Sequence, residues 1–300
     1  MTVNVGIRGG LSTDHLVTAP QGGQFDQLGG PGLYAALGAR LIEGTSVRLC
    51  AGLPADDDRF EALFAQVDVN LDFCSRIASI PRVWILNSGQ GRRIVSTSPQ
   101  GTVELETAAP VGDLPPGDGD APAGFYSGLA GLLDSAPHSR PPANSGTIVG
   151  IDPDQVLVQQ QGLDYLRDVS PPNCALLPSR VQLSLIDRDP RTAARKIAEA
   201  LAAPVIARLD REGMYVVTDS GRWSVSDSAP MVHETTGAGD ASAAAIVAAL
   251  AKGADAVTAA MLGVSVARIA VAGWGSTTLA RADPITSPFN QITAIKEHSA

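Results

Sequence analysis

The residues with the clearest chemical pattern lie at 233–250, where the chain reads HETTGAGDASAAAIVAAL. Gly237, Ala238 and Gly239 precede Asp240, and the alanine-rich run that follows is typical of a helix. A glycine-flanked turn that opens a helix directs several backbone N–H groups toward one point, where the helix dipole adds partial positive charge. The pattern therefore predicts a binding site for an anion.

Asp240 falls in the first turn of this predicted helix, where the dipole favours its ionised form. Beside an anion site, an ionised carboxylate can accept the proton of a hydroxyl that attacks a phosphoryl group. A second interpretation is equally compatible with this stretch: the glycines make a tight turn and Asp240 only stabilises the start of a helix.

The composition limits the class of protein. The chain of 300 residues can form one large domain with an accessory piece, or two domains. With 44% hydrophobic and 18% charged residues it has an ordinary globular composition. A net charge of -9 and a pI near 4.9 argue against a nucleic-acid partner and against an anionic membrane surface.

Targeting signals and metal-ligand spacings are not evident. Residues 1–10 lack the pattern of a signal peptide, and the most apolar run, 241–251, is too short to span a bilayer. Cys50, Cys74 and Cys174 are odd in number and widely spaced, which is typical of reduced thiols. We therefore expect a cytoplasmic protein.

A second glycine motif, GGPGLYAAL, stands at 29–37, about 200 residues before the first. The two motifs, in this order and at this separation, resemble those of the ribokinase-like (PfkB) carbohydrate kinase family. The resemblance implies an α/β fold, a three-layer sandwich with a central, mostly parallel sheet and a small β-sheet lid. It also implies that Asp240 is the catalytic base and that the backbone at 237–240, with Gly237, Ala238, Gly239 and the amide of Asp240, forms the anion hole.

The resemblance also implies two structural parts, a nucleotide-binding core and a lid over the substrate. The core is expected from residues 1–10, 30–80 and 108–300, and the lid from residues 11–29 and 81–107.

Local patterns predict strands and helices that alternate, which favours a parallel sheet covered on both faces. Asp189 and Pro190 are a good N-cap and first residue for one of the helices. Residues 110–146 are rich in Pro, Gly and Asp, and are expected to form a long loop in which only 124–133 is ordered. Strands are predicted at 3–7, 46–49, 147–151, 174–177 and 205–209, helices at 33–43, 57–67 and 190–201, and a hairpin from 83–87 and 92–98.

Four residues are candidates for binding the acceptor. Asp14 matches the family's aspartate that holds sugar hydroxyls, although it can also be a solvated turn residue. Gly29 and Gly30 would bring bare backbone up to the substrate. Tyr34 stands where many relatives carry a substrate-contacting asparagine, and it either contacts substrate or packs in the core.

The nucleotide side departs from the family pattern. Ser179 and Gln182 stand in for the Asn and Glu of an Asn-x-x-Glu motif, and the neutral Gln182 removes a charge that would help to order the metal. Asp210 replaces a glycine and brings an acidic group close to the triphosphate. The resemblance assigns Ser179, Asp210, Gly213 and Thr236 to the nucleotide, and Gln182 and Glu234, which replaces an aspartate, to the metal.

The predicted hairpin carries two adjacent arginines, Arg92 and Arg93. One of them could approach a transferring phosphate, but exposed arginines on a hairpin also serve as a solvated edge.

Together these observations predict an ATP-dependent phosphotransferase that acts on a hydroxymethyl group of a sugar, polyol or nucleoside. ATP, Mg²⁺ and a monovalent cation are the implied cofactors, and pairing of lid strands implies a homodimer. The alternative is a catalytically degenerate PfkB-like protein that binds a sugar or nucleoside as a regulatory module.

Overall fold

The computed structural model describes residues 2–19, 21–88, 91–98, 101–105, 121–122, 124–142, 144 and 146–297. Residues 89 and 90 of the predicted hairpin, and residues 110–120, 123, 143 and 145 of the loop predicted at 110–146, lie outside these residues.

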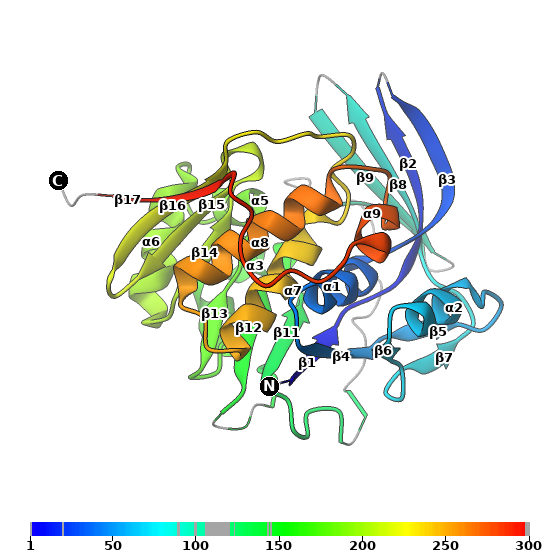
Figure 1. Cartoon of the computed structure of the whole chain (residues 1–300), viewed down its shortest axis with the longest axis horizontal. Helices are drawn as coiled ribbons and strands as arrows, with labels where there is room; N and C mark the ends of the chain where they lie inside the picture. Colours follow the sequence, from blue (N-terminus) through cyan, green and yellow to red (C-terminus); the bar gives the residue numbers. More distant parts are fainter. Residues whose placement is uncertain are drawn as a thin grey trace.

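A ten-stranded sheet forms the centre of the molecule (Figure 1). Seven of its strands pair in parallel, and the three at one edge pair antiparallel. Most residues of the parallel strands are buried, as expected where helices cover both faces. In spatial order the strands are β17 (Ile292–Lys296), β16 (Gly221–Asp227), β15 (Met214–Thr218), β14 (Val205–Arg208), β13 (Cys174–Leu176), β12 (Ile148–Asp152), β11 (Gly131–Ser135), β1 (Val3–Arg8), β4 (Thr45–Cys50) and β6 (Val69–Asn70).

Side chains alternate between the two faces of this sheet, so that neighbouring residues enter different cores. Leu132 and Val205 pack with one layer of helices, whereas Leu133 and Ile206 pack with the other. The helices of the first layer are α3 (Gln155–Gln161), α4 (Leu163–Val169), α5 (Arg180–Ser184) and α6 (Pro190–Leu201). Those of the second are α1 (Pro31–Arg40), α2 (Arg59–Gln66), α7 (Ala238–Ala251), α8 (Ala256–Ala270) and α9 (Thr277–Arg281). This three-layer α/β sandwich confirms the predicted fold class.

A smaller sheet stands apart at one end of the molecule (Figure 1). Its inner strand β2 pairs in parallel with β8, and its other pairings are antiparallel. Its strands are, in spatial order, β10 (Gly101–Leu105), β9 (Gly91–Ser98), β8 (Arg82–Ser88), β2 (Ser12–Thr18) and β3 (Gly22–Gly29). Two short strands, β5 (Gly52–Pro54) and β7 (Ser75–Ile77), form a separate pair.

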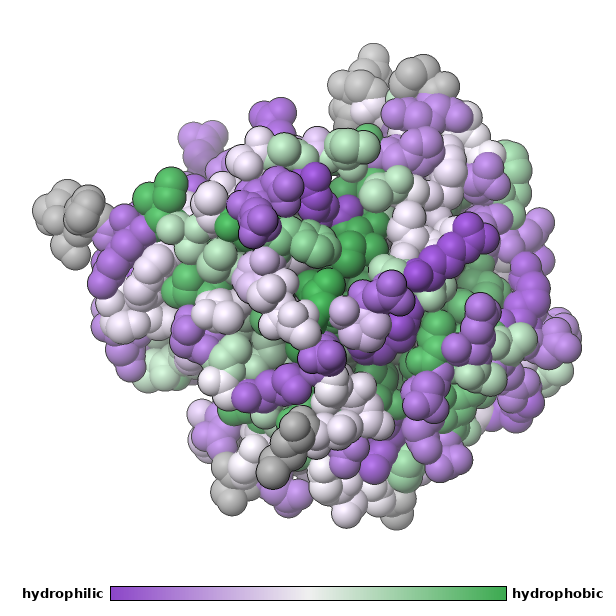
Figure 2. All heavy atoms as spheres, viewed as in Figure 1, coloured by the Kyte–Doolittle hydropathy of each residue, from purple (hydrophilic) through white to green (hydrophobic). Residues whose placement is uncertain are grey.

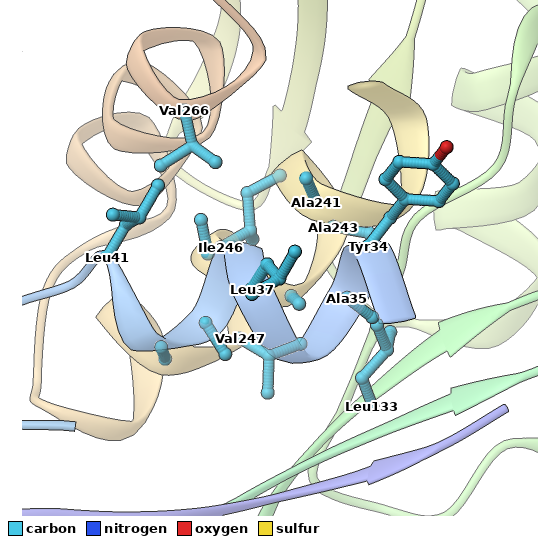
Figure 3. Close-up of a cluster of buried hydrophobic side chains, with 14 of the residues drawn as sticks. Tyr34, Ala35, Leu37, Leu41, Leu133, Ala241, Ala243, Ile246, Val247 and Val266 are labelled. Carbon is cyan, nitrogen blue, oxygen red and sulfur yellow. The ribbon is translucent and has the colours of Figure 1, made fainter. Parts of the chain in front are cut away.

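The two glycine motifs meet because α1 and α7 pack very closely. A Cβ at Gly38 of α1 would lie 2.1 Å from the carbonyl oxygen of Ala241 in α7. Figure 3 shows the aliphatic side chains of both helices in one buried cluster, with Tyr34 beside the start of α7. Small residues on both helices therefore bring the N-terminal motif against the second motif.

Two expectations on local structure differ in outcome. The helix predicted at 190–201 is confirmed as α6 with the same bounds, and the Asp189 side chain accepts a hydrogen bond from Thr192 N–H at 2.9 Å. Within the loop predicted at 110–146, however, Gly131–Ser135 forms β11, a central strand beside β1. The ordered segment expected at 124–133 overlaps this strand, but its place in the centre of the sheet was not predicted, because a short strand buried on both faces has no alternation that separates it from its surroundings.

On the face seen in Figure 2, hydrophilic and hydrophobic residues are interspersed. In the described part of the chain, no helix combines the length and the apolar character needed to cross a membrane.

Candidate active site

The start of α7 has the geometry that the glycine motif predicts. Gly237 is the N-cap residue with φ of 74°, a left-handed conformation that favours glycine. The N–H of Ala238 donates to Thr235 O at 3.3 Å, so this amide already takes part in the turn. The N–H groups of Gly239 and Asp240 belong to the first turn, where an α-helix offers no intrahelical acceptor. These two amides are the better placed to receive an anion.

Asp240 is partly exposed at this helix start. Burial raises the pKa of its carboxyl to about 6, and the nearby Asp152 acts in the same direction, whereas Arg208 and Arg92 oppose the shift. A carboxyl with such a pKa is ionised at neutral pH and can still take up a proton.

Asp14, on β2, is 2% exposed. Its carboxylate accepts a hydrogen bond from Ser12 Oγ at 2.6 Å and one from the Tyr34 hydroxyl at 3.5 Å. Burial raises its pKa to about 6 despite these bonds, and Glu234 adds to the rise. The structure therefore shows a buried carboxyl at this position rather than a solvated turn residue.

Close packing explains the glycines of the N-terminal motif. A Cβ at Gly29 would lie 2.0 Å from Asp14 Oδ2, so any side chain there would displace the carboxylate. Gly30 has φ of 97°, and a Cβ on it would lie 2.6 Å from Gly10 O. Gly29 therefore leaves room for the Asp14 carboxylate, and Gly30 leaves room for the backbone at the start of β2.

Tyr34 joins the two motifs physically. Its ring is buried, and a Cβ at Gly237 would lie 2.1 Å from Tyr34 Cδ1. Figure 3 shows its hydroxyl directed away from the aliphatic cluster, and this hydroxyl faces Asp14. Core packing and contact with the candidate site are thus both properties of this residue.

Glu234 is a buried acid with one satisfied and one unsatisfied oxygen. Oε1 accepts hydrogen bonds from Thr236 N–H at 2.7 Å and from Thr236 Oγ1 at 2.6 Å, and Asn87 Nδ2 of β8 lies 3.5 Å away. Oε2 has no hydrogen-bond partner among the described residues. Burial raises the pKa of the Tyr34 hydroxyl, and the charges of Asp14, Glu234 and Asp240 raise it further. We call these four residues the carboxylate cluster.

A second group, the strand-end network, consists of Asp152, Ser179, Gln182 and Arg208. Arg208 Nη2 donates to Asp152 Oδ1 at 2.6 Å and Nε donates to Leu177 O at 2.9 Å, and the guanidinium is almost fully buried. A Cβ at Gly239 would lie 3.1 Å from Arg208 Nη1, so this cation lies directly beneath the first turn of α7.

Sequence reasoning missed Asp152 and Arg208. The available signal was a charged residue at the end of each of two otherwise apolar strands, at the sheet edge where ligands of such folds gather.

Ser179 and Gln182 make a capping box at the start of α5. Ser179 N–H donates to Gln182 Oε1 at 2.6 Å, while Gln182 Nε2 donates to Asp152 Oδ1 at 3.2 Å and to Pro153 O. The amide oxygen assigned to metal binding is therefore already hydrogen-bonded to the protein. No cluster of three or more His, Cys, Asp or Glu in the described ranges is arranged to hold a metal. Glu234 Oε2, which is buried and unpaired, is better suited to a hydrated cation.

Asp210 is the first residue of a 3₁₀ turn, Asp210–Glu212, that follows β14, and Gly213 caps the end of this turn. Asp210 has φ of 52°, so it adopts the left-handed conformation that a glycine would favour. Its carboxylate lies 2.9 Å from Arg180 Nε, which balances the acidic charge. Gly213 has φ of 83°, and a Cβ on it would lie 2.1 Å from Val225 O.

The structure thus brings the predicted residues into two adjacent groups. Asp14, Gly29 and Gly30 gather near Tyr34 and the start of α7. Ser179 and Gln182 lie beside Arg208. Asp210 lies next to this group, because its carboxylate pairs with Arg180, the residue after Ser179. Two open hollows of about 380 and 240 Å³, formed by residues 284–291 and around Cys174, contain none of the predicted site residues.

Comparison with known proteins supports the same family. A model of the pfkB family carbohydrate kinases matches residues 182–282, which include the second motif. No curated protein sequence matches the chain at a significant level. Over these residues the match confirms the family resemblance drawn from the motifs, and the structural neighbours below share the fold.

Three solved structures illustrate the similarity. Ribokinase from Thermotoga maritima is 18% identical with a TM-score of 0.64, over 93% of this chain and 96% of that chain. Aminoimidazole riboside kinase from Salmonella enterica is 15% identical with a TM-score of 0.69, over 94% and 97%. The nucleoside kinase of Burkholderia thailandensis is 14% identical with a TM-score of 0.67, over 92% and 93%. At these identities the likeness establishes the ribokinase fold.

Proposed function

We propose that this protein is an ATP-dependent phosphotransferase that acts on a hydroxymethyl group of a sugar, polyol or nucleoside. The observation that carries the proposal is the start of α7, where Asp240 and two first-turn amides lie at one point above the Arg208 cation. The structural neighbours support the acceptor class, because they include kinases bound to aminoimidazole riboside and to inosine.

In the proposed mechanism, Asp14 and the backbone at Gly29 and Gly30 hold hydroxyl groups of the acceptor. Asp240 accepts the proton of the attacking hydroxyl as the new O–P bond forms. The bond from the γ-phosphorus to the bridging oxygen breaks, and its electron pair leaves with ADP. The amides of Gly239 and Asp240 stabilise the negative charge on the transferred group.

The cofactor assignments belong to this proposal. ATP is the phosphoryl donor, with Ser179, Asp210, Gly213 and Thr236 on its side of the site. Mg²⁺ bound with ATP supplies charge neutralisation on the phosphates, and Glu234 Oε2 would hold a cation, Mg²⁺ or a monovalent ion, through water. The small sheet, within 11–29 and 81–107, serves as the lid over the acceptor. Strand pairing between two lids would give a homodimer, which sedimentation at several protein concentrations would detect.

The experiment is ADP release from ATP and Mg²⁺ against a panel of sugars, polyols and nucleosides. General-base catalysis contributes about 10²- to 10⁴-fold, so Asp240→Asn should lower turnover by that order. The matched control is Asp255→Asn. Asp255 also begins a helix, and its side chain accepts from Val257 N–H and Thr258 N–H, a role that asparagine retains. If both variants kept wild-type turnover, Asp240 would be only a helix-start residue.

A second candidate function is a binding or regulatory module without efficient phosphotransfer. It is favoured by one observation: Gln182 is neutral and both ends of its side-chain amide are bonded within the protein. A folded protein that binds an acceptor in calorimetry, but neither binds millimolar ATP nor releases ADP with any acceptor, would establish this alternative.

A further inference from the structure

The two adjacent arginines of β9 lie on opposite faces of the small sheet. Successive residues of a strand alternate between faces. In the β8–β9 register, Arg92 pairs with Asn87 and Arg93 pairs with Leu86. The residues that share a face with each arginine therefore show where it points.

Arg92 is on the face that looks toward α7. Ile85 and Ile94, which share this face by alternation, are buried in a cluster with Leu16 against which Trp274 packs. The cross-strand partner of Arg92, Asn87, has its Nδ2 3.5 Å from Glu234 Oε1 of the carboxylate cluster. The inner face of the small sheet thus reaches the candidate active site.

Arg93 is on the outer face. Its cross-strand partner Leu86 and the nearby Trp84 are exposed large hydrophobic residues. Trp84 stacks with His15, which lies on the face of β2 opposite to that of Asp14 and Leu16. Arg93 is therefore directed away from the carboxylate cluster, although it stands next to Arg92 in the sequence.

The charge of Arg92 acts on both ends of the proposed reaction. It lowers the pKa of Asp14 and the pKa of Asp240, although burial outweighs it in both cases. Arg208 also acts on Asp240, from beneath the first turn of α7, where its guanidinium is almost fully buried. Arg92 is exposed on the inner face of the small sheet, and its charge acts on both carboxyls.

We propose that Arg92 is a catalytic residue, whose guanidinium binds the oxygens of the phosphoryl group while it passes from ATP to the acceptor. This inference rests on the proposed phosphotransferase function. The proton still goes to Asp240 and the electron pair of the broken bond to ADP, so Arg92 donates hydrogen bonds only. A guanidinium suits this role because its planar fork of N–H donors matches two phosphate oxygens at once.

The test compares Arg92→Gln with Arg93→Gln, the neighbour on the opposite face, at saturating ATP and acceptor. We expect Arg92→Gln to lower kcat by about 10²-fold or more, as removal of a charge-stabilising donor does, with little change in the KM of the acceptor. Arg93→Gln should stay within about twofold of wild type, and Arg92→Lys should recover part of kcat. Circular dichroism and thermal unfolding verify that each variant is folded.

A pH profile adds a readout that a structural role would not move. Because Arg92 lowers the pKa of Asp240, its removal should shift the acid limb of kcat to higher pH, and Arg93→Gln should leave the limb in place.

Three outcomes would overturn the inference. An active wild type in which Arg92→Gln and Arg93→Gln behave alike excludes the catalytic role of Arg92 alone. If Arg92→Gln raised the KM of the acceptor and left kcat unchanged, Arg92 would be a binding residue for a group on the acceptor itself. A wild type that releases no ADP with any acceptor removes the phosphotransferase function, and this inference with it.

Discussion

The carboxylate cluster and the strand-end network lie on two sides of the α7 helix start, but their polar groups are satisfied to very different degrees. In the carboxylate cluster, Asp14 and Asp240 are acids whose pKa values burial raises to about 6, and Glu234 Oε2 has no partner among the described residues. In the strand-end network, Arg208 and Gln182 are bonded to Asp152 and to main-chain carbonyls.

The difference indicates a division of labour. Buried carboxyls with raised pKa values cost stability at neutral pH and are typical of functional sites. A network whose side chains are bonded to one another and to main-chain carbonyls holds the strand ends in place and supports the helix start above it. We therefore expect changes in the network to reduce stability and neutralising changes in the cluster to increase it while they remove activity.

The largest effect is expected from Arg208→Gln. The substitution leaves Asp152 buried without its cation, and breaking a buried pair in this way costs about 3–5 kcal/mol of unfolding free energy. Urea denaturation measures the loss. The double variant Arg208→Gln/Asp152→Asn should recover most of it, because no uncompensated charge remains. A loss below about 1 kcal/mol in the single variant would mean that the network does not hold the strand ends.

Asp14→Asn should increase the unfolding free energy, by a smaller amount than Arg208→Gln decreases it. The folded-state pKa of Asp14, about 6, is above its ordinary value of 3.8, so the folded state binds more protons than the unfolded state between these values. The contribution of this group to the unfolding free energy is fully present below pH 4 and is lost as the pH rises through 6. The variant should therefore gain on the order of 2–3 kcal/mol at pH 7.5 and almost nothing at pH 4.

Unfolding of wild type and Asp14→Asn at pH 4.0 and 7.5 measures this difference, and Asp134→Asn, whose partner is Arg8 at 3.0 Å, is a contrasting buried carboxyl. Asp14→Asn should also weaken acceptor binding. Equal changes at the two pH values would show that burial of the ionised carboxyl is not the cause.

The contrast also explains what could be predicted from the sequence. The α7 start and α6 were visible because caps, glycines and helix periodicity act within a few residues. The close packing at Gly29 could also be expected, because a glycine motif indicates that another part of the chain or a ligand comes close to the backbone. The three-layer fold followed from the alternation of strands and helices together with the two motifs.

What could not be predicted depends on pairs that only the fold brings together. Arg208 and Asp152 are separated by 56 positions, and nothing in either neighbourhood names the other as a partner. Gln182 looked like a lost metal charge, but its amide bonds Asp152, where a second carboxylate would be repelled. Which of Arg92 and Arg93 faces the site could be decided only from the register of β8 and β9, because the sequence pattern of the hairpin allows either.

Gln182→Glu, which restores the family residue, tests whether the network depends on the side-chain amide of Gln182. The new carboxylate cannot donate to Asp152 Oδ1, which Gln182 Nε2 meets at 3.2 Å. We expect a loss of about 1–2 kcal/mol in unfolding free energy, larger at pH 7.5 than at pH 5, and no gain in turnover. Gln182→Leu removes the bonds that Nε2 donates, and also the acceptor for Ser179 N–H, without adding charge, and serves as the control. Higher turnover in Gln182→Glu would instead show that the metal charge is the missing element.

The smallest effect is expected from Asp210→Gly, at the edge of the network. Glycine relieves the left-handed φ of 52°, but it removes the exposed pair with Arg180 and adds freedom to the unfolded chain. These terms nearly cancel, so the unfolding free energy should change by less than about 0.5 kcal/mol. Loss of an acidic charge near the proposed triphosphate site should lower the KM for ATP by a few-fold at low salt and less at high salt. An unchanged KM at both salt concentrations would place Asp210 away from the nucleotide, because a charge close to the phosphates cannot be neutral in its effect.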